Sequence, residues 1–193
     1  TFSSYSIIKT NELYEWLKVP LTWLGKTSKN IEIHQHESGL VGHIVLLGTH
    51  RTGKELANNF IKHREKFVIV DFNPDVAEYY ARLKVPVVCG DASDSYIQEL
   101  AGFSKAKLIV STLPDMHDNL SIVESVKNNK FKAKLIIMAQ DNDNARELYK
   151  YKVDYVLLPH YINGIHLTRI LKDPHTHKQL ATLKRHHLKA LGV

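Results

Sequence analysis

Two glycines and an aspartate stand at an informative spacing in the middle of the chain. Gly48 and Gly53 follow the apolar run 43–47, and Asp71 ends a second apolar run, residues 67–70. A glycine turn between a strand and a helix lets backbone N–H groups face a phosphate, and an acid about 20 residues later can accept ribose hydroxyls. The pattern predicts a strand–loop–helix–strand unit that holds a nucleotide.

The middle position of this glycine loop departs from the usual pattern. In G-x-G-x-x-G the middle glycine lets the backbone approach a pyrophosphate, and His50 stands at that position here. We therefore expect a dinucleotide to sit differently or to bind less well, while a mononucleotide is less affected. Arg51 beside it can grip phosphate oxygens with two hydrogen bonds. A degenerate, empty site is the alternative.

Further candidate ligands follow the later apolar runs. Asp91 could accept a hydrogen bond from an adenine amino group or a ribose, and Ala92 leaves room for the base. Residues 111–113 follow the fourth apolar run, and we expect them to form the far wall of the pocket. The acids also have ordinary structural alternatives, because Asp71 could cap the turn that follows it and Asp91 or Asp94 could cap the next helix.

The central part of the chain alternates between short apolar runs and helical stretches. Runs rich in Val, Ile and Leu are typical of strands buried on both faces of a parallel sheet. The sequence therefore predicts an α/β fold: a Rossmann-like, doubly wound, mainly parallel six-stranded sheet over residues 41–171, with flanking N- and C-terminal helices. We expect strands at 43–47, 67–70, 86–89, 107–110, 134–138 and 155–158, and helices near 53–65, 74–83, 95–100, 118–128 and 144–150.

The two ends of the chain differ from this domain. Residues 1–40 contain Leu and Trp at three- and four-residue spacing, followed by a polar linker. Their aromatic and lysine side chains suit a membrane interface, but the residues alone favour a helix packed on the domain or on a second subunit. Residues 172–193 predict a basic C-terminal helix, either solvated or bound to a partner.

Composition narrows the class of protein. The 193 residues carry a formal net charge of +6, with 44% apolar and 24% charged residues, as in ordinary globular proteins. The single cysteine, Cys89, excludes a disulfide framework, and its apolar surroundings favour a buried structural thiol. The basic residues form no aromatic-interleaved basic helix, so we expect no nucleic-acid partner.

No residue set typical of catalysis accompanies the nucleotide pattern. Hydride transfer needs a substrate domain with an acid or base, and only short flanks remain to build one. The paired histidines lack accompanying carboxylate or cysteine ligands, so we expect no metal site. We therefore expect no enzyme, and keep a small NAD-dependent oxidoreductase and a nucleotide-free assembly domain as alternatives.

Together these segments resemble the RCK N-domain, also called the KTN or TrkA-N domain, which regulates potassium channels and transporters. The chain looks most like the version fused to Kef-type cation–proton antiporters, in which a histidine-arginine glycine loop and a Leu-Pro-His segment like residues 158–160 occur. The resemblance covers about residues 42–171. It is carried by residues 48–53, 68–74, 90–94, 106–112 and 118–119.

The resemblance implies a regulatory domain on the cytoplasmic side of a prokaryotic cell membrane, with residues 1–40 as a juxtamembrane amphipathic helix and linker. It implies binding of an adenine nucleotide (NAD(H), AMP or ATP) that gates transport of potassium or another monovalent cation. Its implied partners are a transmembrane cation-transport domain, in the same or an associated chain, and further copies in a homodimer or higher homo-oligomer through the Rossmann domain. The nucleotide-binding residues that it implies are Gly48, Thr49, His50, Arg51, Thr52, Gly53, Asp71, Phe72, Asn73, Asp91, Ala92, Ser93, Thr112 and Leu113.

Overall fold

The computed structural model describes residues 39–172 and 176–191, all of which belong to one unit of the chain, residues 33–193. The helix and linker predicted for residues 1–40 lie outside the described residues, apart from Gly39 and Leu40. Within the described residues, no helix combines the length and the apolarity that a membrane crossing requires.

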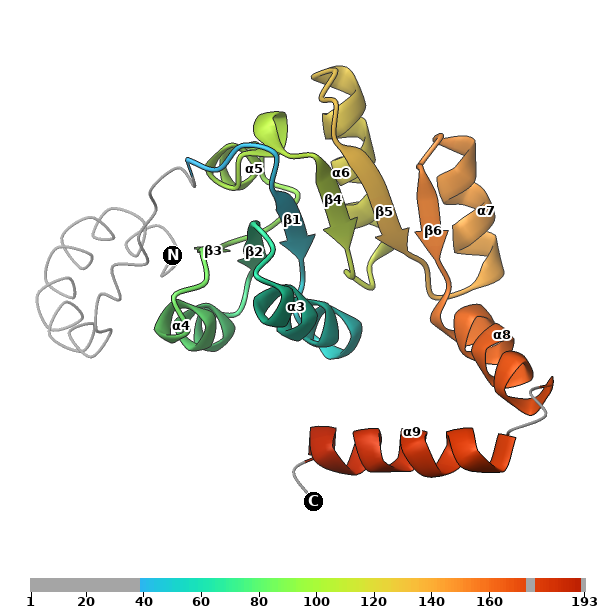
Figure 1. The fold of residues 1–193 in the computed structure, drawn as a ribbon. Coiled ribbons are helices and arrows are strands. Elements are labelled where there is room, and N and C mark those ends of the chain that lie inside the picture. Colours follow the sequence, from blue (N-terminus) through green and yellow to red (C-terminus); the bar gives the residue numbers. More distant parts are fainter. Residues whose placement is uncertain (1–38, 173–175, 192–193) are drawn as a thin grey trace, which may run out of the picture. The chain divides into compact units, whose positions relative to one another are not determined.

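A six-stranded, fully parallel sheet forms the centre of the described unit (Figure 1). The strands lie in the order β3-β2-β1-β4-β5-β6, so the order reverses between β1 and β4. All residues of β1 and β2 are buried, as expected for apolar strands covered on both faces. The strands are β1 (Ile44–Leu47), β2 (Phe67–Asp71), β3 (Val87–Cys89), β4 (Leu108–Ser111), β5 (Lys134–Met138) and β6 (Tyr155–Leu157).

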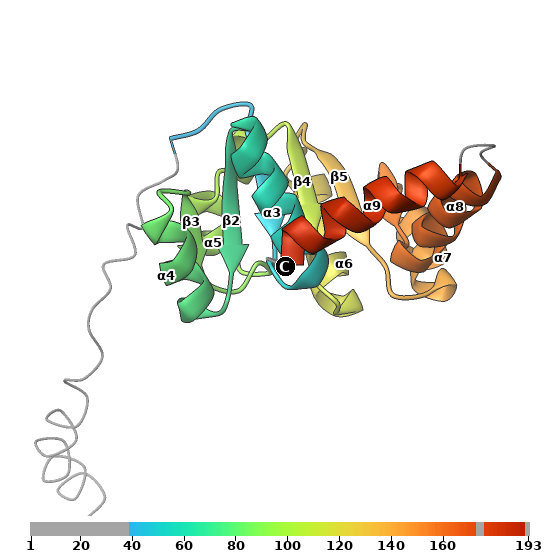
Figure 2. The same ribbon diagram turned by 60° about the horizontal axis from the view of Figure 1, so that its bottom comes forward.

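Helices connect each strand to the next and extend the chain beyond β6 (Figures 1 and 2). The side chains of Asn73, Asp94, Asp115 and Asp141 each accept a hydrogen bond from a backbone N–H in the first turn of the helix that follows. Such caps fix where a helix begins. The helices are α3 (Arg51–His63), α4 (Pro74–Arg82), α5 (Ser95–Leu100), the 3-10 helix η2 (Phe103–Lys105), α6 (Met116–Asn128), α7 (Asn142–Lys150), α8 (Pro159–Lys172) and α9 (Thr176–Leu191).

Two apolar clusters lie on opposite faces of the sheet because successive strand residues point to opposite sides. Val45 and Leu47 belong to the cluster that also contains residues of α5, α6 and α7. Ile44 and Leu46 belong to the cluster that contains residues of α3 and α4. The sheet is therefore wound on both faces, as the sequence predicts.

The predicted boundaries differ from the observed ones by one or two residues in most elements. β5 and α5 have the predicted limits, whereas α3 begins two residues before the predicted start because the glycine turn ends at His50. Helix α8 is absent from the prediction, since it contains Gly164 and buries only Ile170 among its residues. Helix α9 lies within the segment for which the sequence predicts a basic C-terminal helix.

Candidate functional site

A cavity of about 1180 Å³ opens beyond the carboxyl ends of the strands. Open parallel sheets bind ligands at this edge, at the point where the strand order reverses. Of the fourteen predicted nucleotide-binding residues, twelve line the cavity, and Gly53 and Ser93 do not. The twelve are Gly48, Thr49, His50, Arg51, Thr52, Asp71, Phe72, Asn73, Asp91, Ala92, Thr112 and Leu113.

The glycine loop after β1 is shaped by close backbone packing. Gly48 has a φ of +77°, a conformation that favours glycine. A β-carbon at Gly53 would lie 2.1 Å from the carbonyl oxygen of Gly48 and 2.6 Å from Oγ1 of Thr112. Gly53 therefore lies beneath the loop and permits its path, which explains why it does not line the cavity.

Thr112 supports this loop from the neighbouring strand. Its hydroxyl donates to the carbonyl oxygen of Gly48 at 2.9 Å and lies 3.2 Å from that of Leu47. Thr112 and Leu113 line the cavity, and because β4 lies directly beside β1, Thr112 also contacts the glycine loop.

The start of α3 presents unused backbone donors to the cavity. His50 is the N-cap residue, with an extended backbone and no capping hydrogen bond from its side chain, and the first turn contains no acidic residue. The first N–H groups of a helix lack partners within the helix, and its dipole places positive charge there, which favours an anion. Arg51 follows with a φ of +32°, so a strained residue stands at this point.

Asp71 is already engaged by the protein. Its side chain is buried, and Oδ2 accepts hydrogen bonds from the backbone N–H of Thr49 at 2.9 Å and from the Thr49 hydroxyl at 2.7 Å. Oδ1 accepts from the backbone N–H of Asn73 at 3.0 Å, so the predicted alternative of a turn cap is present. A carboxylate offers about four acceptor positions. Asp71 thus fixes the glycine loop and retains limited capacity for a ribose hydroxyl.

The segment after β3 forms a second polar group at the cavity. Asp91 is exposed, and its Oδ1 accepts from the backbone N–H and the hydroxyl of Ser93, each at 2.8 Å. Of the two predicted cap candidates, Asp94 is the one that caps α5. Ala92 is buried in the cavity wall, and its small side chain leaves space in the cavity beside it. Ser93 is turned toward Asp91 and does not line the cavity.

The prediction misses the other half of the cavity. This half is formed beyond β5 and β6 and includes Met138, Ala139, Gln140, Pro159, His160 and Asn163. These residues follow the fifth and sixth strands at the same edge of the sheet, so strand order could have placed them. Pro159 and His160 belong to the Leu-Pro-His segment that the resemblance singles out, although the sequence analysis assigns them no binding role, whereas the others have no motif and only their position as a signal.

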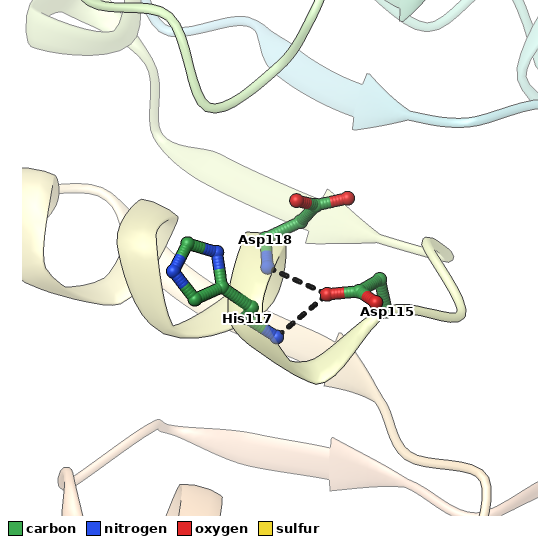
Figure 3. Close-up of side chains that lie close together, drawn as sticks. All are labelled: Asp115, His117 and Asp118. Carbon is green, nitrogen blue, oxygen red and sulfur yellow. Dashed lines mark hydrogen bonds between the residues drawn. The ribbon is translucent and has the colours of Figure 1, made fainter.

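Asp115, His117 and Asp118 lie together at the start of α6, where Figure 3 shows the Asp115 carboxylate facing two backbone N–H groups. One oxygen of Asp115 accepts from the N–H of His117 at 2.7 Å and of Asp118 at 3.1 Å. Their potential ligand atoms lie within 4.8 Å of one another. Helix capping accounts for this arrangement, so we assign no metal to it. Burial raises the pKa of the Asp118 carboxyl, and the Asp115 and Asp91 carboxylates raise it further.

Cys89 is only partly buried, contrary to the predicted buried thiol, because it is the last residue of β3. Its thiol makes a weak hydrogen bond to the carbonyl oxygen of Phe72, with 3.9 Å between sulfur and oxygen. Burial raises the pKa of this thiol, and the Asp71 carboxylate raises it further. Since the thiolate is the nucleophile, these surroundings disfavour a reactive role.

The sequence pattern of one family, the TrkA-N domain, matches residues 44–159. The chain belongs to the TrkA-N domain family. The match runs from the first residue of β1 to the first residue of α8, and so contains the whole sheet and the glycine loop.

The TrkA-N domain described here is similar to parts of longer proteins. It is 26% identical over 138 residues to the probable potassium channel protein 2 of Methanocaldococcus jannaschii, covering 70% of this chain and 40% of that protein. It is 28% identical over 111 residues to the glutathione-regulated potassium-efflux system protein KefC of Klebsiella pneumoniae, covering 58% of this chain and 18% of KefC. The chain thus spans less than half the length of these curated relatives.

A solved structure supports the fold assignment. The Kef CTD of Shewanella denitrificans, in its AMP-bound form, aligns with a TM-score of 0.59 at 20% identity, covering 77% of this chain and 94% of that one. At this identity the likeness establishes the common Rossmann-like architecture of the TrkA-N domain.

Proposed function

We propose that this TrkA-N domain is a non-catalytic regulatory domain that binds an adenine nucleotide and thereby controls transport of potassium or another monovalent cation. The observation that carries the proposal is the cavity at the strand-order reversal, where the glycine loop, the start of α3 and Asp71 meet. The names of the curated relatives, a potassium channel and a potassium-efflux system, support the link to cation transport.

The phosphate end of the ligand belongs at the start of α3. The first-turn N–H groups supply hydrogen-bond donors, no acidic side chain opposes them there, and the Arg51 guanidinium adds a full positive charge. His50 has an extended backbone that needs no glycine conformation, so its effect on the ligand comes from its side chain rather than from the path of the loop.

The nucleoside end belongs on the β2–β3 side of the cavity. In this proposal the remaining acceptor position of Asp71 holds a ribose hydroxyl, with Phe72 and Asn73 beside it in the cavity lining. The exposed Asp91 carboxylate accepts from the adenine amino group, next to Ala92. AMP is bound in the Kef CTD structure, which supports this class of ligand. The cavity exceeds the usual range of roughly 300–1000 Å³, so NAD(H) and ATP also fit by size.

Regulation follows if nucleotide binding favours one arrangement of paired domains. A ligand shifts such an equilibrium only as far as its affinity differs between the two arrangements. In this proposal residues 41–171 bind the nucleotide and pair with another copy. Residues 1–40 link the domain to a transmembrane cation-transport domain on the cytoplasmic side of the membrane, and residues 172–193 form a basic appendage.

The test is isothermal titration of the full chain with AMP, ATP, NAD and NADH. We expect micromolar binding of at least one of them, weakened by about tenfold or more in Arg51→Gln because a charge-assisted contact to phosphate is lost. Arg146→Gln is the matched control, since Arg146 is an exposed arginine on α7 that does not line the cavity. Absence of binding by all four, from a folded sample, would refute the nucleotide role and favour an assembly domain. Oxidation of NADH by a panel of small carbonyl compounds would refute the non-catalytic role.

A further inference from the structure

The edge of the sheet opposite the cavity, where the strands begin, carries a row of lysines. Backbone hydrogen bonds join the segments that carry these lysines. The Ile44 N–H donates to the carbonyl oxygen of Lys66 at 2.9 Å, the Lys107 N–H to that of His43 at 2.9 Å, and the Lys134 N–H to that of Lys107 at 3.0 Å. By the strand register, Lys66 and Lys107 lie level with His43 on either side of it, and Lys134 lies one residue further along the next strand. Because neighbouring strands are about 4.8 Å apart, these three lysines lie close together. We call this edge, with the turns that precede the strands, the amino edge.

Four turns add a cation at an unfavourable backbone position. Arg64, Lys84, Lys130 and Lys152 follow α3, α4, α6 and α7, with φ values of +55°, +59°, +55° and +55°. Glycine or asparagine usually stands at such a position, because a β-carbon is disfavoured there. A cation also suits the negative end of a helix dipole, but a lysine in the preceding turn would serve that purpose without strain. A cationic side chain recurs at all four turns, and all four turns lie at the amino edge, between the end of a helix and the start of the next strand.

The cations of the amino edge are exposed and largely unpaired. In the described part of the chain, Lys107 pairs with Glu65 at 3.9 Å and Lys134 pairs with Asp154 at 2.7 Å, and the others have no carboxylate within ion-pair distance. The exposed cations of this edge are Arg64, Lys66, Lys84, Lys105, Lys107, Lys130, Lys132, Lys134 and Lys152. A surface of this kind attracts an extended negative charge.

The chemistry and position of these residues indicate the partner. All but one are lysines, which act as flexible point charges rather than as the rigid forks that recognise a single carboxylate or phosphate. They are spread across the whole width of the sheet, which matches a delocalised negative surface. The chain also enters the domain at this edge, because Gly42 and His43 lead directly into β1 and the Gly42 N–H donates to Lys105 at 2.8 Å.

We propose that the amino edge docks on the anionic headgroup surface of a membrane. The nucleotide cavity then faces away from the lipid, because it lies at the opposite ends of the same strands. Docking acts independently of the nucleotide, and the attraction weakens as salt screens the charges.

The test is co-sedimentation of the full chain with vesicles of phosphatidylcholine alone and of equimolar phosphatidylcholine and phosphatidylglycerol. The edge variant is Lys84→Gln/Lys105→Gln/Lys132→Gln, and the matched control is Lys54→Gln/Arg146→Gln/Lys172→Gln, which removes the same charge from exposed helix positions. Thermal unfolding establishes that each variant is folded.

We expect the wild-type chain to prefer the anionic vesicles and to lose this preference at high salt. Each lysine near an anionic surface contributes about fivefold in partitioning, so the edge variant should bind at least about tenfold more weakly, and the control less than about twofold. Equal binding to both kinds of vesicle, or an equal loss in both variants, would overturn the proposal. It would also fall if the edge variant lost binding to duplex DNA while keeping its vesicle binding, since the edge would then be a nucleic-acid surface.

Discussion

The substitution Gly53→Ala should displace the glycine loop and remove nucleotide binding. The new β-carbon would lie 2.1 Å from the Gly48 carbonyl oxygen and 2.6 Å from Oγ1 of Thr112. The Gly48 carbonyl belongs to the backbone, so it cannot rotate away as the end of a long side chain can. Ordinary van der Waals contact begins near 3.4 Å, so the loop and α3 must separate by more than 1 Å.

The cost can be worked from these contacts. Overpacking of a tight interior site costs about 1–3 kcal/mol. Displacing the Gly48 carbonyl also breaks or weakens its 2.9 Å hydrogen bond from the Thr112 hydroxyl, which adds about 1 kcal/mol. We therefore expect the free energy of unfolding to fall by about 2–4 kcal/mol. Nucleotide affinity should fall by at least about tenfold, because the phosphate donors at the start of α3 move with the loop.

Urea unfolding and isothermal titration measure the two effects, and Gly164→Ala is the matched control. Gly164 lies within α8, and a β-carbon there would meet no atom within 4 Å outside the backbone of its own helix. Alanine at this position should add up to about 1 kcal/mol of helix stability. If Gly53→Ala unfolded at the wild-type urea concentration and bound nucleotide with unchanged affinity, the close approach inferred at Gly53 would be refuted.

Three further substitutions test the surroundings of the cavity. Thr49→Val keeps the side-chain volume but removes the hydroxyl bond to the buried Asp71, so urea unfolding should show a loss of about 2 kcal/mol, and an unchanged midpoint would contradict this. Asp115→Ala removes the cap of α6 and should cost about 1 kcal/mol in the same assay, with Asp115→Ser restoring most of it. The raised pKa of Asp118 means that its ionised form lowers the free energy of unfolding. This loss of stability is present above the pKa of the folded state and disappears as the pH falls through that pKa. Relative to Asp118→Asn, wild-type stability should therefore rise as pH falls through the window just above the ordinary aspartate pKa of about 3.9. If the melting temperatures of the two proteins changed by the same amount with pH across that window, this expectation would be contradicted.

Much of the fold could be predicted because its signals are local. The apolar runs mark the strands, and Asn73 and Asp94 mark helix starts, since capping depends on residues only two or three positions apart. The glycine loop is partly local, because Gly48 has a positive φ and the nearest neighbour of a β-carbon at Gly53 would be the Gly48 carbonyl, five residues earlier.

The arrangement of the cavity could not be read in the same way, because it depends on which strands become neighbours. Position along the chain predicts that Thr112 belongs to the far wall of the pocket, but it does not predict that β4 pairs with β1 and brings the Thr112 hydroxyl to the glycine loop. The half of the cavity beyond β5 and β6, including Gln140 and His160, is assembled from segments far from the glycine loop in sequence. The engagement of Asp71 by Thr49 likewise joins residues 22 positions apart and has no sequence signature.

The central place of β1 has a consequence for how the chain folds. Ile44 pairs with Phe67 on one side and with Leu108 on the other, so the first strand of the sheet to be synthesised needs two neighbours that appear later. At about 5–20 residues per second, the ribosome exposes β4 several seconds after β1. During that interval one side of the apolar strand Ile44–Leu47 has no native partner, and unpaired strand edges promote aggregation. Synthesis pauses between β2 and β4 should therefore lower the yield of folded protein more than pauses after β4.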